Sequence, residues 1–423
     1  MRAMRTLLTG PAAAVVMALL AGVVPVRADD PTPLPLEDVI ERVQKVAPQR
    51  RAAADRVDAA RGALYQAGRF PNPLLEARAE NVRIDSNGFT AGNPPLDFFA
   101  LLSQPVELGG KRAKREAVAS AELQATGAEL RLTERQVTLD TMRLYVAAVR
   151  ARELVHYLGE NRADLEPLLE VMQKRVREGY TPEADLAKLR AEAARVDTQL
   201  AQARLELDRA TVTLGIAMTD PTPLAPARLV EPPLIDIPTG NTEELAARIV
   251  AAQPLIQATQ ARVDRAKETV SLEKAQRIPN PLVTGGYKRV DDRNTMVMGV
   301  VVPIPVLDTN AGNIERAMAE ERAAAFDLDA LRRQLTADAV ALIIGARDLT
   351  ARARRIEQDL VEPAHVARQA ARTTFREVGT NILGLVDAER VHTEAHRDAL
   401  EITLEAFARS YEVQLALPQD TPK

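Results

Sequence analysis

One four-residue motif occurs twice in this chain. Pro-Asn-Pro-Leu occupies residues 71–74 and returns at residues 279–282. Each copy follows a polar, alanine-rich stretch and precedes two short apolar segments, which lead into a very long run of helical composition. A duplicated unit constrains the architecture more than any single element does. The sequence therefore predicts two tandem structural repeats, each made of a helix, a strand pair, a very long helix and a return helix.

Proline, glycine and changes in apolar periodicity set the expected boundaries of these repeats. The predicted parts are a signal peptide at 1–28, a first repeat at 29–219 with strands at about 74–85 and 96–108, a proline-rich linker at 220–241, a second repeat at 242–417 with strands at about 282–290 and 295–302, and a C-terminal tail at 418–423. The alternation in the first strand changes parity near Asn81, which predicts a β-bulge there. Residues 86–95, rich in Gly, Asn and Pro, are expected to form a turn.

The first 28 residues have the pattern of a secretory signal. Arg2 and Arg5 supply a basic start, residues 11–24 form an apolar run, and Val26-Arg27-Ala28 offers small residues where a signal peptidase cleaves. The apolar run is too short to span a bilayer comfortably, which disfavours a transmembrane anchor. We therefore expect an exported protein that is periplasmic, secreted or in the outer membrane.

The predicted strands have the length of tilted strands that cross an outer membrane. Four strands cannot close a barrel, and an open sheet edge is not viable in lipid. Several chains are therefore expected to share one barrel, and three chains would supply twelve strands. The alternative is a small soluble sheet that caps a helical bundle.

The long helical runs carry a heptad pattern. Between Ala339 and Leu360 the apolar positions alternate steps of three and four residues, which is typical of helices packed side by side. A helix of about 65 residues would be about 100 Å long, which is more than a globular domain requires. Pro167 and Pro363 lie inside these runs and predict kinks. Glycine-containing turns at 178–182 and 377–381 predict the reversals of two helical hairpins.

Composition excludes several classes of function. The net charge of −4 is small for 423 residues, and no basic face supports nucleic-acid binding. The absence of cysteine excludes disulfides, thiolate metal sites and cysteine nucleophiles. We find no serine–histidine–aspartate order, phosphate loop or dinucleotide fingerprint, so no enzyme activity and no cofactor are predicted.

Three histidines fall close together in the predicted return hairpin. His392 and His396 are one helical turn apart, and His365 lies on the preceding helix. Such spacing can bind zinc, but two imidazoles without a third or fourth ligand hold a metal weakly. An exposed polar face is the favoured interpretation, and no metal site is assigned.

Two sequence features resemble the TolC family of outer-membrane efflux proteins. They are the duplicated Pro-Asn-Pro motif and residues 102–112, Leu-Ser-Gln-Pro-Val-Glu-Leu-Gly-Gly-Lys-Arg. The second segment resembles the CzcC-type branch, which serves cobalt, zinc and cadmium export. The resemblance implies a mainly α fold with a small β part, assembled as a homotrimer with a twelve-stranded barrel in outer-membrane lipid. It also implies a long α-helical periplasmic tunnel that docks a periplasmic adaptor (a membrane fusion protein) and an inner-membrane RND pump.

The same resemblance implies roles for residues near the two helical turns. Asp387 and Asp185 become gate and selectivity candidates, because a threefold axis would turn each into a ring of carboxylates. The other interpretation is that both are solvated charges near helix N-termini. Asn381 stands where the archetype of the family has an arginine that pairs with the first-repeat aspartate. The adaptor-docking turns would comprise Gly179, Tyr180, Thr181, Gly379, Thr380 and Asn381.

The predicted function is a passive exit duct with a periplasmic gate, for heavy-metal cations. One alternative is a TolC-like duct for drug export or type I protein secretion. A periplasmic coiled-coil scaffold without a pore is the disfavoured alternative, since adaptors usually have one helical hairpin between β-rich domains. The substrate itself is set by the pump that feeds the duct.

Overall fold

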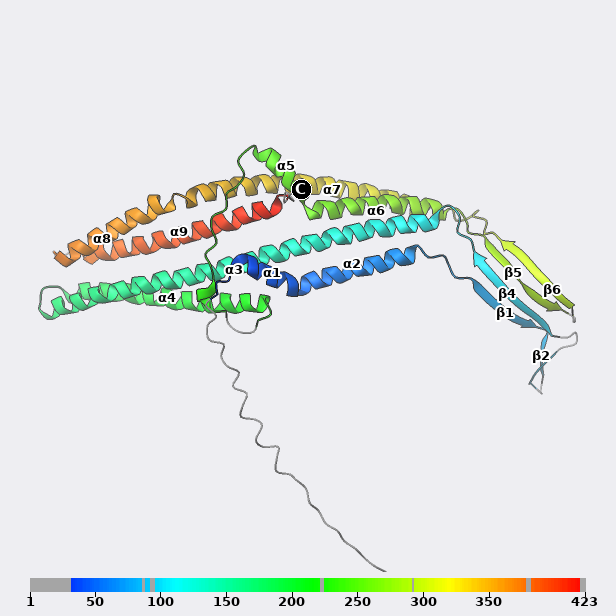
Figure 1. Cartoon of the computed structure of the whole chain (residues 1–423), viewed down its shortest axis with the longest axis horizontal. Coiled ribbons are helices and arrows are strands. Elements are labelled where there is room, and N and C mark those ends of the chain that lie inside the picture. Colours follow the sequence, from blue (N-terminus) through cyan, green and yellow to red (C-terminus); the bar gives the residue numbers. More distant parts are fainter. Residues whose placement is uncertain are drawn as a thin grey trace, which may run out of the picture.

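The computed structural model describes residues 32–85, 88–91, 96–220, 224–290, 293–377 and 382–418. The chain forms a long, gently curved bundle of helices with a sheet at one end (Figure 1). The expected signal peptide at 1–28 lies outside the described residues, as do Gly379, Thr380 and Asn381 and most of the expected tail at 418–423.

Helices form most of the described chain. They are α1 (Leu36–Val46), α2 (Pro48–Ala67), α3 (Lys111–Arg177), α4 (Glu183–Ala217), α5 (Thr242–Ala252), α6 (Pro254–Gln276), α7 (Ala311–Ala353), α8 (Glu362–Glu377) and α9 (Ile382–Ala416), with a short 3₁₀ helix η1 (Pro226–Arg228) and a π-helix η2 (Glu357–Val361). The strands are β1 (Leu74–Glu80), β2 (Val82–Asp85), β3 (Gly88–Ala91), β4 (Asp97–Pro105), β5 (Leu282–Val290) and β6 (Arg293–Val301).

Helix α3 sets the length of the molecule. Its 67 residues extend about 100 Å at the α-helical rise. Buried alanines such as Ala125, Ala128 and Ala148 recur along it, so neighbouring helices can approach closely. The helix continues through Pro167 without interruption. Away from the sheet, α3 and α4 form one antiparallel hairpin and α8 and α9 form another beside it (Figure 1).

The second internal proline is accommodated by a wider helical turn. Pro363 follows η2, and the N–H of Glu362 bonds to the carbonyl of Glu357, five residues back. The proline ring would otherwise crowd the carbonyl of Asp359, four residues before it. The helix before Pro363 therefore widens into a π-helical segment.

Strands β1, β4, β5 and β6 form one antiparallel sheet in that order. The single strand expected over 74–85 is wrong, because Asn81 adopts a left-handed φ of 63° and ends β1. Asparagine tolerates this conformation, and the Asn81 side-chain amide donates to Asp97 Oδ2 at 3.0 Å. Beyond it, β2 pairs with β3 as a separate hairpin, so part of the expected turn at 86–95 is a strand. The strand expected over 96–108 ends at Pro105.

The core is distributed along the bundle. One cluster near the middle includes Tyr145 of α3, whose hydroxyl is within hydrogen-bond distance of the carbonyls of Leu34 and Val230 and so attaches the segments before α1 and after α4 to the helices. Another lies near the α3–α4 turn and includes Leu165, Leu189, Phe375 and Leu385, all fully buried.

Within the described part of the chain, no helix has both the length and the apolar character needed to cross a bilayer.

Candidate functional site

The turn between α3 and α4 is a tight reversal at the end of the bundle farthest from the sheet. Gly179 has a φ of +77°, which a residue with a side chain rarely adopts. Its N–H bonds to the carbonyl of Val176, and the N–H of Tyr180 bonds to the carbonyl of Arg175. These two bonds form a Schellman motif, which caps the C-terminus of α3. Tyr180 is 79% exposed and Thr181 is half-buried, so the turn offers a surface to a partner.

One arginine connects this turn to the neighbouring hairpin. The Arg175 guanidinium donates to the backbone carbonyls of Phe375 and Arg376, at 3.2 and 2.9 Å. It also lies 5.6 Å from the centre of the buried Phe375 ring. Cations near the last carbonyls of a helix are favourable, so Arg175 caps α8 while it belongs to α3. Nothing in the sequence pattern around Arg175 distinguishes it from the neighbouring basic residues Lys174 and Arg177.

The two gate candidates do not form a pair. Asp185 lies in the first turn of α4, and its Oδ1 accepts a bond from Lys188 Nζ at 3.0 Å within the same helix. Asp387 lies in the second turn of α9 and is exposed. Arg390, three residues later, is 3.6 Å from Glu192 and not paired with Asp185. Within one chain, each aspartate is therefore a helix-end charge on its own hairpin.

A buried cluster of charges joins α3, α8 and α9. Arg368 and Arg372 of α8 lie between Asp164 of α3 and Glu389 of α9. Arg368 donates to Glu389 at 2.9 Å and to Asp164 at 2.6 Å, and Arg372 donates to both carboxylates as well. Glu389 is 1% exposed. Burial alone would raise the pKa of Asp164, but hydrogen bonds and charge from the two arginines outweigh it and lower that pKa.

The sequence alone does not reveal this cluster. Arg368 and Arg372 are one turn apart, which is a common spacing for exposed charges. Their partner Asp164 is 204 residues away from Arg368 in the sequence. The only local signal is that the spacing puts both guanidinium groups on one face of α8.

The histidines lie beside this cluster, and the exposed face expected for them is wrong for His392. Its side chain is 2% exposed, because α9 turns it toward α3 and α8. Burial, followed by the charge of Arg368 and the nearby imidazoles, lowers the pKa of His392 to about 3. Burial raises the pKa of the neighbouring Tyr157 to about 12. The described side chains include no group of three or more His, Asp or Glu already arranged to hold a metal ion.

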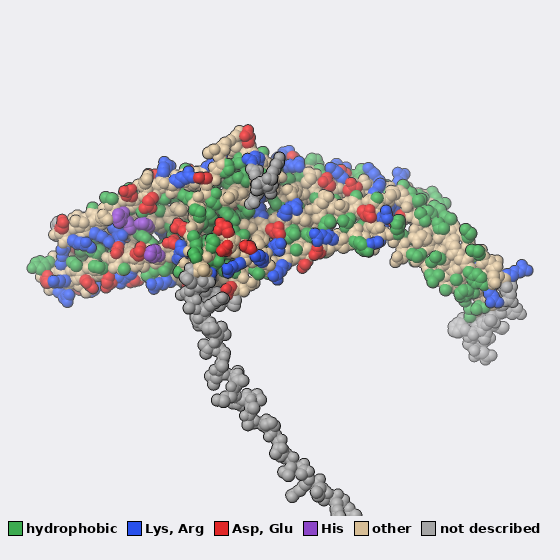
Figure 2. Space-filling view, viewed as in Figure 1, with side chains coloured by type: hydrophobic (Ala, Val, Ile, Leu, Met, Phe, Trp, Pro, Cys, Tyr) green, Lys and Arg blue, Asp and Glu red, His purple; other side chains and the backbone are tan. Residues whose placement is uncertain are grey.

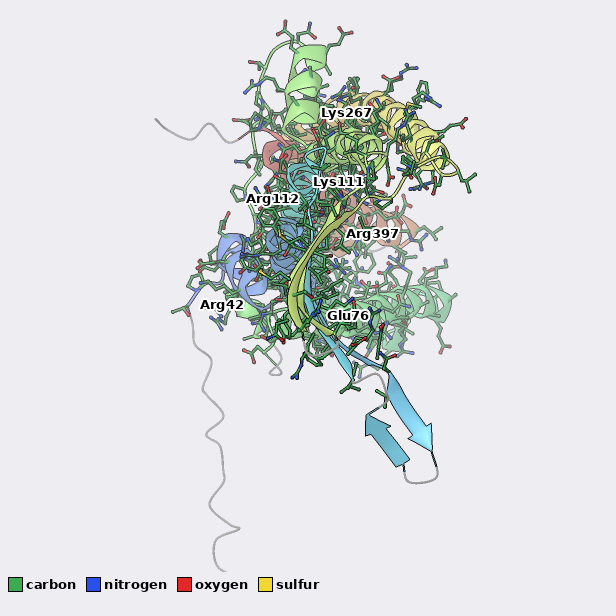
Figure 3. The ribbon with its side chains drawn as sticks, turned by 90° about the vertical axis from the view of Figure 1, so that its right-hand side faces the viewer. Arg42, Glu76, Lys111, Arg112, Lys267 and Arg397 are labelled. Atoms are coloured by element: carbon green, nitrogen blue, oxygen red, sulfur yellow. The ribbon has the colours of Figure 1, made fainter. Side chains whose placement is uncertain are left out.

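At the other end of the bundle, the two sequence motifs contact each other. Lys111 begins α3 where the helices meet the sheet (Figure 3), and its ammonium donates to the Ile278 carbonyl and to Asn280 Oδ1. Asn280 is the asparagine of the second Pro-Asn-Pro. Its Oδ1 also accepts from the backbone N–H of Leu108. Residues 102–112 and the second motif thus hold β4, β5 and α3 in one junction.

The chain is similar in sequence to outer-membrane efflux and metal-resistance proteins. Residues 39–218 match the family model described as outer membrane efflux protein. The chain is 28% identical over 351 residues to the cobalt-zinc-cadmium resistance protein CzcC of Cupriavidus metallidurans, covering 81% of this chain and 80% of that protein. It is 25% identical to the nickel-cobalt-cadmium resistance protein NccC of Alcaligenes xylosoxydans xylosoxydans, covering 72% and 68% of the two chains.

Solved structures share the fold at low identity. CusC, whose structures concern folding and transmembrane channel formation, superposes with a TM-score of 0.77 at 15% identity. The superposition covers 90% of this chain and 91% of the CusC chain. The outer membrane protein VceC of Vibrio cholerae superposes with a TM-score of 0.71 at 19% identity, covering 90% and 94%. Residues 39–218 thus match the outer membrane efflux protein model, the chain shares its fold with solved outer-membrane channels, and over most of its length it is similar to a cobalt-zinc-cadmium resistance protein.

Proposed function

We propose that this protein is the outer-membrane exit duct of a tripartite RND-type efflux system, and that its cargo is heavy-metal cations. The observation that carries the proposal is the architecture: one helix about 100 Å long runs from an antiparallel sheet to a capped turn. That length suits a conduit between two membranes. The metal-resistance relatives support the choice of cargo.

The duct would be built from three chains. In one chain the sheet ends at β1 and β6, whose outer edges have no partner strand among the described residues. Such edges are not tolerated in lipid, so neighbouring chains would pair there and close a twelve-stranded barrel. Met296, Met298 and Val300 of β6 are 83, 84 and 62% exposed. Figure 2 shows hydrophobic side chains gathered over the strand end, as a lipid-facing surface requires.

Within each chain we propose two tandem repeats, 29–219 and 242–417, joined by the proline-rich segment 220–241. Each repeat would contribute one helical hairpin to the tunnel wall. The pump and its adaptor would supply the energy, so the duct needs no catalytic group. A drug or type I secretion duct would share this architecture and differ only in its pump, whereas a scaffold would not explain the exposed apolar strand face.

Deletion of the gene tests the cargo. We expect the deletion strain to become more sensitive to zinc, cobalt and cadmium, and a plasmid copy to restore resistance. Sensitivity should be unchanged for dyes and detergents, since the relatives are metal-resistance proteins. A strain sensitised to drugs and not to metals would favour the alternative duct.

We propose that Asp387 is a gate residue and that it affects cation block and selectivity more than Asp185 does. Three copies near a pore axis would form a ring that concentrates cations. Asp387→Asn should weaken block by divalent cations and reduce cation preference in bilayer conductance, with the fold intact because a helix-end charge is worth at most about 1 kcal/mol. Asp185→Asn is the comparison, and its effect should be smaller because Asp185 is already paired with Lys188. If divalent cations block the Asp387→Asn channel as strongly as the wild type, Asp387 is a solvated helix-end charge and not a gate residue.

We propose the turns around Gly179 and 379–381 as the adaptor-docking surface. Gly179→Ala should cost about 1–2 kcal/mol because alanine resists the left-handed conformation. Adaptor association, measured by co-purification, should fall. Gly159→Ala is the control: Gly159 lies within α3, where an added Cβ meets nothing within 4 Å, so it should leave association intact. Equal association in both variants would contradict the docking role.

A further inference from the structure

Three of the four histidines of the chain come together in one cavity. The cavity has a volume of about 450 Å³ and lies between α3, η2, α8 and α9. The ring centroids of His392 and His396 are 4.6 Å apart, and those of His365 and His392 are 5.5 Å apart. Figure 2 shows histidine side chains gathered at this place on the visible face. The fourth histidine, His156, lies outside the cavity on α3 with its side chain 67% exposed.

Tyr157 contacts one ring nitrogen of His392, and the other ring nitrogen has no partner. The tyrosine hydroxyl donates to the His392 backbone carbonyl at 3.3 Å, and a carbonyl can only accept. The tyrosine oxygen also lies 2.8 Å from His392 Nδ1, a bond in which either atom can be the donor. When Nδ1 carries the proton, Nε2 has a free lone pair, and Nε2 is buried without a hydrogen-bond partner. Histidines that bind metals are held in this way, by a bond from the ring nitrogen that does not bind.

The ring spacing suits a metal ion. A zinc–nitrogen bond is about 2.0–2.1 Å long, so the centroid of a ligating imidazole lies about 3 Å from the ion, and two such rings at a tetrahedral angle lie about 5 Å apart. The two observed separations lie on either side of that value. The rings are not yet arranged around an ion, since His365 Nε2 is 2.7 Å from Gln369 Nε2. Rotation about χ2 of His365 would turn its Nε2 away from Gln369 and leave its centroid nearly in place.

The charges around the cavity also admit a cation. Glu160 and Glu357 line it and offer carboxylate oxygens as further ligands. Arg368 lines it too, but its guanidinium already donates to Glu389 and Asp164. The positive charge of Arg368 is thus neutralised by carboxylates of the buried cluster.

We propose that His365, His392 and His396 form a binding site for a divalent transition-metal cation such as Zn²⁺, with a carboxylate or water completing the coordination. The site goes beyond the proposed function, because a passive duct needs no resident ion. An ion there would join α8 to α9 beside the buried charge cluster. It would therefore stabilise the hairpin that carries Asp387.

Metal binding by the full-length, tag-free protein in detergent tests the site. Zn²⁺ uptake is measured by equilibrium dialysis, and Co²⁺ by the visible absorption of its imidazole complex. We expect one ion per chain in the wild type and in the control His156→Gln, which removes the histidine outside the cavity. His365→Gln and His396→Gln should each bind about tenfold more weakly or worse. His392 is left unchanged because it is buried.

The proposal is overturned if the wild type takes up no Zn²⁺, or if either cavity variant keeps wild-type affinity. Neither result bears on export, because the dialysis contains no pump or adaptor. A metal-sensitive deletion strain together with a protein that binds no zinc would leave the duct standing and remove the site. If the protein binds zinc but its deletion leaves metal resistance normal, the zinc site would stand and the metal-export duct would be removed.

Discussion

Glu389→Gln should weaken the attachment of α8 to α9 by about 3–5 kcal/mol. Removing one partner of a buried ion pair leaves the other charge in a poorly solvated place, and losses of this size are typical. The Arg368 and Arg372 side chains are only 10 and 17% exposed, so water cannot replace the lost carboxylate. Among the described residues, Asp164 would remain as the one acidic partner of the two arginines. It is 49% exposed, and a single carboxylate cannot neutralise two guanidinium groups.

Hydrogen exchange of the α8 amides measures this effect. A loss of this size corresponds to exchange from the opened hairpin about a hundredfold faster or more. Glu401→Gln is the matched control on the same helix, since Glu401 pairs with Arg150 at 3.4 Å and is 50% exposed. An exposed pair is worth at most about 1 kcal/mol. Similar exchange in the two variants would mean that the buried cluster does not hold the hairpin.

Gly286→Ala should disrupt the sheet, whereas Gly285→Ala should not. Gly286 is paired with Leu101 across β4 and β5, and a Cβ there would lie 2.3 Å from the Ala100 carbonyl oxygen and 2.8 Å from Leu101 Cα. These are backbone atoms, which cannot rotate away. A Cβ at Gly285 meets nothing within 4 Å.

We expect a cost near the upper end of the range of about 1–3 kcal/mol for inserting an extra methyl group into a filled space. Both variants restrict the unfolded chain equally, so the difference between them isolates the steric clash. Native mass measurement of membrane extracts should show three-chain assemblies for the wild type and Gly285→Ala, and a reduced yield for Gly286→Ala. Equal yields would mean that the sheet accommodates a Cβ at Gly286.

The elements of the fold follow from local patterns. Pro73 and Pro281 precede strands because proline stops a helix, and the strands begin at Leu74 and Leu282. Gly179 marks a reversal because only glycine takes its φ of +77° without strain. The heptad pattern predicts long helices, since the spacing of apolar residues reports which face is covered. Asn81 was expected to cause a bulge and instead ended the strand, because parity alone does not distinguish the two.

The candidate site depends on contacts between distant segments. Glu389 and Glu401 lie on the same helix, and nothing in their neighbourhood in the sequence separates the buried carboxylate from the exposed one. His392 likewise has the spacing of an exposed face and is buried because α3 packs against that side of α9.

The sequence by itself therefore determined the long helices, the glycine reversal and the Pro-Asn-Pro strand starts, because backbone sterics and apolar periodicity act over a few residues. Only the tertiary structure decided which charges are buried together and where the histidines meet. Those facts depend on which helices become neighbours, and the partners in the buried cluster are 204 residues apart along the chain.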